Sequence, residues 1–253
     1  MTTRVSVVVP LYNEEEGLPL LVDKLTTLRQ RLAPQCELEC VLVDDGSQDG
    51  TLEKLRQYFN GTPNVITVAH GRNRGLGAAL RSGFQHASGE VIATIDADCT
   101  FDPLILPSLL EAMERENADI AIGSPYHPQG GVENVVPWRL FLSRGASRLY
   151  RMVCPAKLFS YTSLMRAYRR RVLERVTPES NGFDGVTELL LRALFAGYRA
   201  VEIPTVLRRR ASGVSKMNIA RTIKAHLRLA SRALLWRFRR PSAAVLARSS
   251  KQS

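Results

Sequence analysis

The chain has 253 residues, of which 45% are hydrophobic and 23% are charged. These are ordinary values for a globular protein, and they exclude a disordered, collagen-like or coiled-coil chain. The length allows one large domain, or one domain with a short appendage. A core of this size needs no disulfide, and the cysteine spacing predicts reduced, packed thiols. The cysteines are Cys36, Cys40, Cys99 and Cys154.

The net charge of +11 is distributed unevenly along the chain. Residues 203–253 contain 13 Lys or Arg and no Asp or Glu, whereas residues 1–202 contain 22 basic and 24 acidic residues. The body is therefore close to neutral, and the positive excess lies in the C-terminal tail. A basic chain can bind nucleic acid. A charge confined to the tail, without interleaved aromatic residues or a zinc motif, argues against that class of protein.

The sequence predicts neither a membrane span nor a secretory signal. The N-terminal apolar run has only about eight residues, ends at Pro10 and is followed by acidic residues, so it is too short for a signal peptide. No run of about 18 apolar residues occurs in the chain. The sequence predicts a cytoplasmic protein without a transmembrane segment.

The first half of the chain alternates between short β-branched runs and helical patterns. The spacing of apolar residues predicts strands at 4–10, 41–47, 64–69, 90–95 and 119–123, and helices at 14–32, 50–59, 75–87 and 103–117. This alternation predicts an α/β fold with a mainly parallel sheet and helices on both faces. In open sheets of this kind, ligands bind beyond the carboxyl ends of the strands.

The second half is less regular. A long loop is expected at 124–137, because its Gly and Pro residues interrupt both the helical and the strand pattern. Helices are predicted at 139–154 and 185–196, strands at 162–168 and 198–203, a basic loop at 208–216 and a last helix at 217–240. The polar residues beyond that helix are expected to be frayed.

Polar residues gather where the first two predicted strands end. Pro10 ends the first strand, Tyr12 and Glu14 follow it, and Asp44 and Asp45 lie at the end of the second. Because neighbouring parallel strands end at one edge of the sheet, a ring could stack on a base there and a carboxylate could accept its N–H. Residues of these types are also common in ordinary strand-to-helix turns, so both interpretations stay open.

Two carboxylates, Asp96 and Asp98, follow an apolar strand with one alanine between them. In an extended backbone, residues two apart point to the same side. Two hard oxygen ligands on one side suit Mg²⁺ or Mn²⁺ shared with a diphosphate. A purely structural role is the weaker interpretation, because two unpaired like charges destabilise each other.

The order of motifs resembles that of a known enzyme family. The motifs are PLYNE, VDDGSQDGT, NRGLGAALRSGF, IDADCTFDP, GSPY, SRGAS, RAYRR, GYRAVEIP and RRRASGVSK, from Val5 to Lys216. The chain resembles inverting family 2 glycosyltransferases of the GT-A fold, and among them the dolichol- or polyprenyl-phosphate sugar synthases. The resemblance implies a Rossmann-like nucleotide-diphospho-sugar transferase domain at 1–216. A basic amphipathic helix and polar tail follow at 217–253.

The resemblance also implies roles in binding a nucleotide sugar. The residues expected to hold its nucleobase and ribose, or to lie beside the nucleotide, are Pro10, Tyr12, Glu14, Asp44, Asp45, Asn73, Arg74 and Gly75. Asp96 and Asp98 match the family's Asp-x-Asp pair, which contacts the ribose and the divalent ion. The implied cofactor is Mg²⁺ or Mn²⁺, and the implied sugar donor is linked to UDP or GDP.

Other matches concern phosphates and the acceptor. Arg139 and Ser143 fall where this subfamily recruits groups for the acceptor phosphate and the diphosphate. Arg210 and Lys216 match basic residues that close over the same phosphates. Glu188 matches an acidic position that the family places near the acceptor.

Three departures from the common family pattern lie near the expected sugar and acceptor. Thr100 stands where a Gln can complete the metal shell, and Pro125 stands where a loop arginine is usual. The stretch from Ser163 to Arg170 differs from the usual GSFRLYRR-like sequence. The donor sugar and the lipid are the features that these departures leave open.

The acceptor decides whether a general base is needed. Negative charge builds on the leaving nucleoside diphosphate, and a metal ion with Arg and Lys stabilises it. A lipid phosphate is already anionic near pH 7, whereas a hydroxyl must lose a proton. Asp184 and Glu188 could supply a base, or could be plain N-terminal helix charges. The sequence predicts transfer to a polyprenyl phosphate, with a hydroxyl acceptor on a lipid, glycan or natural product as the alternative.

The last predicted helix is amphipathic and basic. A stripe of apolar residues lies opposite a stripe of Lys and Arg. The apolar stripe comprises Ile219, Ile223, Leu227, Ala230, Leu234 and Phe238. Such a helix can lie in an anionic lipid interface, which predicts a peripheral protein on the cytoplasmic membrane face. It can also pack on the body with a solvated basic face, or support an oligomer.

Overall fold

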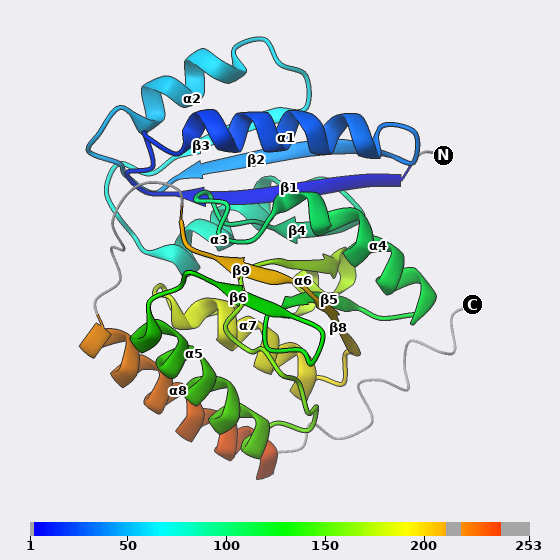
Figure 1. The fold of residues 1–253 in the computed structure, drawn as a ribbon, viewed down its shortest axis with the longest axis vertical. Coiled ribbons are helices and arrows are strands. Elements are labelled where there is room, and N and C mark those ends of the chain that lie inside the picture. Colours follow the sequence, from blue (N-terminus) through cyan, green and yellow to red (C-terminus); the bar gives the residue numbers. More distant parts are fainter. Residues whose placement is uncertain (1–2, 211–218, 239–253) are drawn as a thin grey trace.

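A computed structural model describes residues 3–210 and 219–238 (Figure 1). A seven-stranded sheet with the order β3-β2-β1-β4-β7-β5-β8 runs through its centre. The strands are β1 (Thr3–Leu11), β2 (Cys36–Asp44), β3 (Val65–Ala69), β4 (Val91–Thr94), β5 (Ile120–Ser124), β7 (Arg166–Arg169) and β8 (Ala200–Pro204). Only β7 is antiparallel to its neighbours, β4 and β5. The mainly parallel sheet predicted from the alternation of elements is confirmed.

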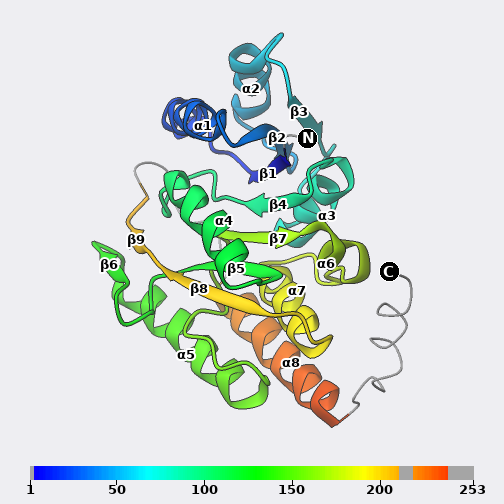
Figure 2. The ribbon, with the colours of Figure 1, turned by 90° about the vertical axis from the view of Figure 1, so that its right-hand side faces the viewer.

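Helices cover both faces of this sheet (Figure 2). One face carries α1 (Leu18–Leu32), α2 (Thr51–Phe59) and α4 (Leu106–Arg115), and a short 3-10 helix (Pro103–Ile105) leads into α4. The other face carries α3 (Leu76–His86), α6 (Arg170–Arg175) and α7 (Asp184–Phe195). In the first half of the chain the described elements match the predicted ones to within a few residues, except that β2 begins at Cys36 and not at residue 41.

The alternation of side chains in β1 explains why its sequence is almost continuously apolar. Val7 and Val9 pack toward α1 and α4, whereas Val8 packs with Ala79 and Leu80 of α3 on the other face. A strand that is buried on both faces needs apolar residues at successive positions. The valine-rich run after Arg4 is therefore the signature of a central strand.

The carboxyl ends of the first strands meet at one edge of the sheet. Leu11 at the end of β1 pairs with Asp44 at the end of β2, and Asp44 pairs with Ala69 at the end of β3. β4 runs parallel to β1 on its other side, with Thr94 opposite Val8. The loops that follow these strands therefore leave the sheet on the same side, which places their polar residues together.

Three short elements were not predicted. Strand β6 (Gly131–Glu133) lies inside the expected long loop and pairs in parallel with β9 (Val206–Arg208), and α6 follows β7 directly. Segments of three to six residues carry too little periodicity to be recognised. The β6–β9 ladder consists of backbone hydrogen bonds between two segments that lie far apart in the sequence. The strand predicted at 162–168 is also shorter than expected, since β7 begins at Arg166.

Helices α5 (Pro137–Val153) and α8 (Ile219–Phe238) lie side by side at the end of the molecule remote from α1 and α2 (Figures 1 and 2). Leu229, Ala230 and Ala233 of α8 are buried in one apolar cluster with residues of α5 and α7. Within the described residues, no helix has both the length and the apolar character needed to cross a membrane. The cysteines are free thiols, buried or half-buried, as predicted.

Candidate functional site

Asp96 and Asp98 lie on a tight turn after β4. The ladder with β1 ends where the Ile95 N–H donates to the Val8 carbonyl at 3.1 Å, and the Cys99 N–H then donates back to the Asp96 carbonyl at 3.2 Å. The prediction that this pair lies on extended backbone is wrong, because the chain turns where β4 stops pairing with β1. Both carboxylates nevertheless line the same cavity.

Thr100 holds the two carboxylates in this turn. Its N–H donates to Asp98 Oδ1 at 3.1 Å, and its hydroxyl donates to Asp96 Oδ2 at 3.2 Å. The threonine at this departure from the family pattern therefore orients both acids.

The acidic turn has the electrostatics of a cation site. Burial and the neighbouring Asp98 raise the pKa of Asp96 to about 8, since two ionised carboxylates this close repel each other. In the described part of the chain, no three His, Cys, Asp or Glu side chains form a metal-binding group. A cation on Asp96 and Asp98 would complete its shell with phosphate oxygens and water, as Mg²⁺ commonly does. The residues present fit Mg²⁺ or Mn²⁺ bound together with a diphosphate.

Arg210 reaches this turn because of β9. The Arg208 N–H donates to the Thr100 carbonyl at 2.9 Å, which ties the end of β9 beside the acidic turn. Arg210 Nη2 then lies 2.6 Å from Asp98 Oδ2, and its Nη1 lies 3.8 Å from Glu14 Oε1. The structure thus brings together Glu14, Asp98 and Arg210, which the sequence had assigned separately to the nucleotide, the metal and the phosphates.

Arg139 and Ser143 approach from α5. Burial and the positive charge of Arg210 lower the pKa of Arg139, while Asp98 opposes this shift. One turn further along α5, the Ser143 hydroxyl lies 2.6 Å from the Thr162 hydroxyl. Two guanidinium groups therefore lie beside two carboxylates, an arrangement suited to a diphosphate bound with a cation.

A cavity of about 800 Å³ is lined by Asp96, Asp98, Arg139, Ser143 and Arg210. Most of the other lining side chains are apolar, and those contributed by α5 and α8 include Trp138, Phe141, Leu149, Ile223 and Leu227. Sequence reasoning missed these walls. The sequence does show apolar residues along one side of each of these two amphipathic helices. The pattern does not predict that the two helices lie next to each other.

Hydrogen bonds join the loops that follow β1 and β2. The Asn13 N–H donates to the Ser47 hydroxyl at 2.9 Å, and the Gln48 N–H donates to Asn13 Oδ1 at 2.7 Å. The Glu14 N–H donates to the Thr51 hydroxyl at 2.9 Å. Pro10, Tyr12 and Glu14 are half-buried at this edge, so the residues predicted to hold a nucleotide lie together.

Asp45 organises the third loop rather than facing the cavity. Its carboxylate accepts hydrogen bonds from the N–H groups of Arg74 and Gly75, at 2.9 and 2.7 Å. His70 Nδ1 lies 2.7 Å from Asp45 Oδ1, and its Nε2 lies 2.9 Å from the Ser82 hydroxyl. This buried network fixes the loop Asn73–Gly75, whose side chains at Asn73 and Arg74 are exposed.

Asp44 differs from its neighbour. One oxygen, Oδ2, accepts from the Ser47 N–H at 3.2 Å. The other, Oδ1, is buried and accepts no hydrogen bond from any of the described residues. A buried carboxylate oxygen without a donor is costly, which makes it a candidate acceptor for a ligand N–H or O–H.

Two other predicted residues do not join this group. Glu188 is fully buried on α7 and is not among the described residues that line the cavity. Lys216 lies outside the described residues. The role of Glu188 near an acceptor and that of Lys216 near the phosphates stay predictions.

The fold and site define a glycosyltransferase. Residues 6–177 match the family model described as Glycosyl transferase family 2, so the chain belongs to that family. It is 37% identical over 225 residues to a polyprenol monophosphomannose synthase from Mycolicibacterium smegmatis, covering 86% of this chain and 82% of that protein. It is 35% identical over 235 residues to a dolichol-phosphate mannosyltransferase from Pyrococcus furiosus, covering 92% of this chain and 64% of that protein.

Solved structures support the GT-A-like fold. Glucosyl-3-phosphoglycerate synthase from Mycobacterium tuberculosis, in complex with Mn²⁺, UDP and glucosyl-3-phosphoglycerate, superposes with a TM-score of 0.66 at 20% identity, over 95% of this chain and 82% of that chain. TarS from S. aureus, in complex with UDP-GlcNAc, gives a TM-score of 0.65 at 19% identity, over 92% and 66%. The fold class expected from the sequence is confirmed.

Proposed function

We propose that the protein is a metal-dependent inverting glycosyltransferase that moves a sugar from a UDP- or GDP-linked donor to a polyprenyl phosphate. The observation that carries this proposal is the amphiphilic cavity. Asp96, Asp98, Arg139 and Arg210 line it together, and most of the other lining side chains are apolar. A polyprenyl phosphate has the same division into a charged head and an apolar chain. Because the names of both relatives include mannose, mannose is the first sugar to test.

The nucleotide is assigned to the loops after β1, β2 and β3. Tyr12 offers a ring for stacking on the base. The buried Asp44 Oδ1 accepts no hydrogen bond from the described residues and is suited to accept an N–H of the base. Asp45 acts on the nucleotide through the loop Asn73–Gly75 that it holds.

The diphosphate is assigned to the acidic turn. Asp96 and Asp98 would hold Mg²⁺ or Mn²⁺, which supplies positive charge against the leaving nucleoside diphosphate. Arg139 and Arg210 contribute guanidinium groups at the same place, where charge grows as the sugar–phosphate bond breaks. Ser143, which lines the cavity from α5, can hydrogen-bond a phosphate oxygen.

The set of available carboxylates favours a phosphate acceptor. Among the described residues that line the cavity, Asp96 and Asp98 are the acids, and both are assigned to the metal. A hydroxyl acceptor would need a separate general base, whereas a phosphate oxygen is already anionic near neutral pH. Glu188 is buried and fully engaged by other groups, so it is poorly suited to that role.

Phe141 and Leu227, which line the cavity, also belong to the exposed apolar residues of α5 and α8. On α5, Phe141 is 77% exposed, and on α8, Leu227 and Leu235 are 60% and 62% exposed. The acid-free sequence from residue 203 onward adds positive charge. We assign this surface to peripheral contact with an anionic membrane on its cytoplasmic face, since apolar area and basic charge together favour such an interface. The helix predicted at 217–240 serves as the membrane-surface element in this proposal.

The deciding experiment compares acceptors. Purified protein with Mg²⁺ is incubated with UDP- or GDP-linked sugars and either a polyprenyl phosphate or the polyprenol of the same chain length, and products are read by mass spectrometry. Glycosylated polyprenyl phosphate with one donor, and no product from the polyprenol, supports the proposal. Product from the polyprenol alone would establish a hydroxyl acceptor instead.

A further inference from the structure

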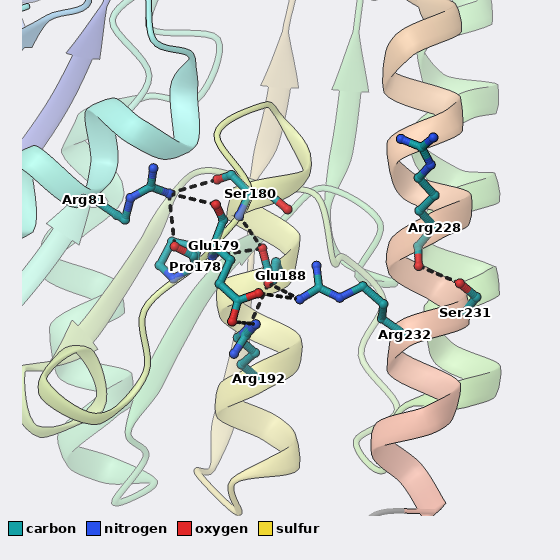
Figure 3. Close-up of polar contacts among 9 residues, drawn as sticks. All are labelled: Arg81, Pro178, Glu179, Ser180, Glu188, Arg192, Arg228, Ser231 and Arg232. Atoms are coloured by element: carbon teal, nitrogen blue, oxygen red, sulfur yellow. Dashed lines mark hydrogen bonds and ion pairs between the residues drawn. The ribbon is translucent and has the colours of Figure 1, made fainter.

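The buried carboxylate of Glu188 joins three parts of the chain (Figure 3). Its Oε2 accepts hydrogen bonds from the backbone N–H groups of Glu179 and Ser180, at 3.1 and 2.7 Å. Its Oε1 accepts from Arg192 Nε on the same helix at 2.8 Å, and from Arg232 Nη2 on α8 at 3.3 Å. Both oxygens are therefore paired, and the buried charge is compensated.

This carboxylate stays ionised at neutral pH. Burial by itself would raise the pKa of Glu188, but the hydrogen bonds from Ser180 and Arg192 outweigh it and lower the pKa. An ionised group with four hydrogen bonds is suited to holding its neighbours in place.

Glu179 makes a second link to α8. Its Oε1 lies 2.5 Å from Arg192 Nη2, and its Oε2 lies 2.7 Å from Arg232 Nη2. Both guanidinium groups also lie over the ring of Trp236, at 5.0 and 5.4 Å from its centroid. Arg232 is thus fixed against α7 and against the segment 178–181.

The segment 178–181 in turn supports the start of α3. The Gly77 N–H donates to the Asn181 carbonyl at 2.7 Å, and Arg81 donates to the carbonyls of Pro178 and Ser180 at 3.0 and 3.1 Å. A Cβ atom at Gly77 would lie 2.1 Å from the Ser180 carbonyl oxygen. The backbones of the two segments therefore touch directly.

The start of α3 also carries the loop that Asp45 holds. The N–H groups of Arg74 and Gly75 donate to Asp45, and Leu76 lines the cavity. A Cβ atom at Gly75 would lie 2.4 Å from the Asn181 carbonyl oxygen. A continuous series of contacts therefore runs from Arg232 on α8, through the segment 178–181, to the loop Asn73–Gly75.

We propose that Glu188 and Arg232 are positioning residues, through which α8 holds the loop Asn73–Gly75 in the geometry that binds the sugar donor. This inference rests on the proposed function, in which that loop lies beside the nucleotide. It assigns α8 a part in donor binding. This role is in addition to lining the cavity proposed for the acceptor and to the proposed membrane contact.

The test compares two alanine variants of the same helix. Arg232→Ala removes the link to Glu179 and Glu188, and Arg228→Ala removes the same charge from an exposed position one turn away. With a short, water-soluble prenyl phosphate as acceptor, Arg232→Ala is expected to raise the KM for the nucleotide sugar by about threefold to tenfold. The acceptor KM and kcat should change less, and Arg228→Ala should leave the donor KM at the wild-type value. Arg232→Lys, which keeps a cation, should recover part of the donor affinity.

A second variant separates this role from folding. Glu179→Gln alters an exposed carboxylate that pairs with both arginines, and it should raise the donor KM without lowering the thermal unfolding midpoint appreciably. Equal donor KM values in wild type, Arg232→Ala and Glu179→Gln would overturn the inference while leaving the proposed function intact. Wild-type protein that turns over no nucleotide sugar would overturn the proposed function, and the inference with it.

Discussion

Arg210 and Asp98 form an ion pair of 2.6 Å between the segment that follows β9 and the turn that follows β4. The pair exists because β9 pairs with β6 and because the Arg208 N–H bonds to the Thr100 carbonyl. It places a guanidinium group directly beside the carboxylates assigned to the metal. Arg210 is therefore placed to pair with the negative charge of a diphosphate bound at the same turn.

Alanine at Arg210, or at Arg139, is expected to lower kcat by about 10² or more, the cost of removing one electrostatic stabiliser of a transition state. Steady-state kinetics with a water-soluble prenyl phosphate measure this loss. Arg148→Ala is the control, since Arg148 is exposed on α5 and is not among the residues that line the cavity. Unchanged kinetics in both Arg210→Ala and Arg139→Ala would mean that the phosphates bind elsewhere.

Asp98→Asn is expected to abolish transfer and to leave the unfolding midpoint close to that of the wild type, because the change keeps the shape of the side chain and removes a metal ligand. EDTA should stop the wild-type reaction, and added Mg²⁺ or Mn²⁺ should restore it. Asp102→Asn is the matched control, as Asp102 pairs with Lys24 and caps the short helix before α4. Full activity in EDTA would refute the metal assignment.

Two glycines in helices should respond to alanine in opposite directions. A Cβ atom at Gly77 meets the Ser180 carbonyl oxygen, whereas at Gly145 of α5 it meets nothing within 4 Å. Gly77→Ala is expected to lower the free energy of unfolding by about 1–3 kcal/mol through overpacking. Gly145→Ala should raise it by about 0.5–1 kcal/mol, since alanine favours a helix. Urea unfolding measures both, and equal effects would contradict the contact between α3 and the segment 178–181.

Membrane contact is expected to depend on the exposed apolar residues of α5 and α8. Phe141→Glu and Leu227→Glu should each weaken binding to vesicles that contain anionic lipid, as measured by flotation, because a carboxylate is both polar and repelled by the surface. Leu20→Glu is the control, since Leu20 is exposed on α1 at the opposite end of the molecule (Figure 1). Equal binding by all three variants would indicate that this surface packs against protein instead.

His226 should make stability depend on pH. Burial lowers the pKa of this imidazole below its ordinary value of 6.5, with Asp184 opposing the shift, and its Nδ1 lies 2.9 Å from the Tyr150 hydroxyl. As pH falls below 6.5, the unfolded chain therefore takes up a proton that the folded protein does not, and the free energy of unfolding decreases. Urea unfolding between pH about 7.5 and about 5.5 should show a steeper loss for the wild type than for His226→Gln. Parallel curves would contradict a neutral, buried His226.

Most of the sheet could be predicted from the sequence because its signals are local. The valine run of β1 and the acidic ends of β2 and β4 each lie within ten residues of chain, and parallel strands bring such ends to one edge. The order of the family motifs then implied the roles of Asp96, Asp98 and Arg139, and the fold places these three side chains in one cavity.

The details of the site depend on contacts between distant segments. β6 and β9 have too little local pattern to be recognised, yet their pairing brings Arg210 to Asp98. Asp96 and Asp98 were expected on extended backbone, and the turn that holds them follows from the end of the ladder with β1.

Glu188 shows the same limit most clearly. Its sequence position fits an acid near an acceptor, or a plain helix charge, and the spacing of residues cannot distinguish these roles. The tertiary structure surrounds it with backbone N–H groups of the segment 178–181 and with Arg192 and Arg232. The sequence by itself determined which groups carry charge and which elements carry them. Which charges meet was decided by the packing of α7 and α8, because burial and pairing depend on neighbours that are far away along the chain.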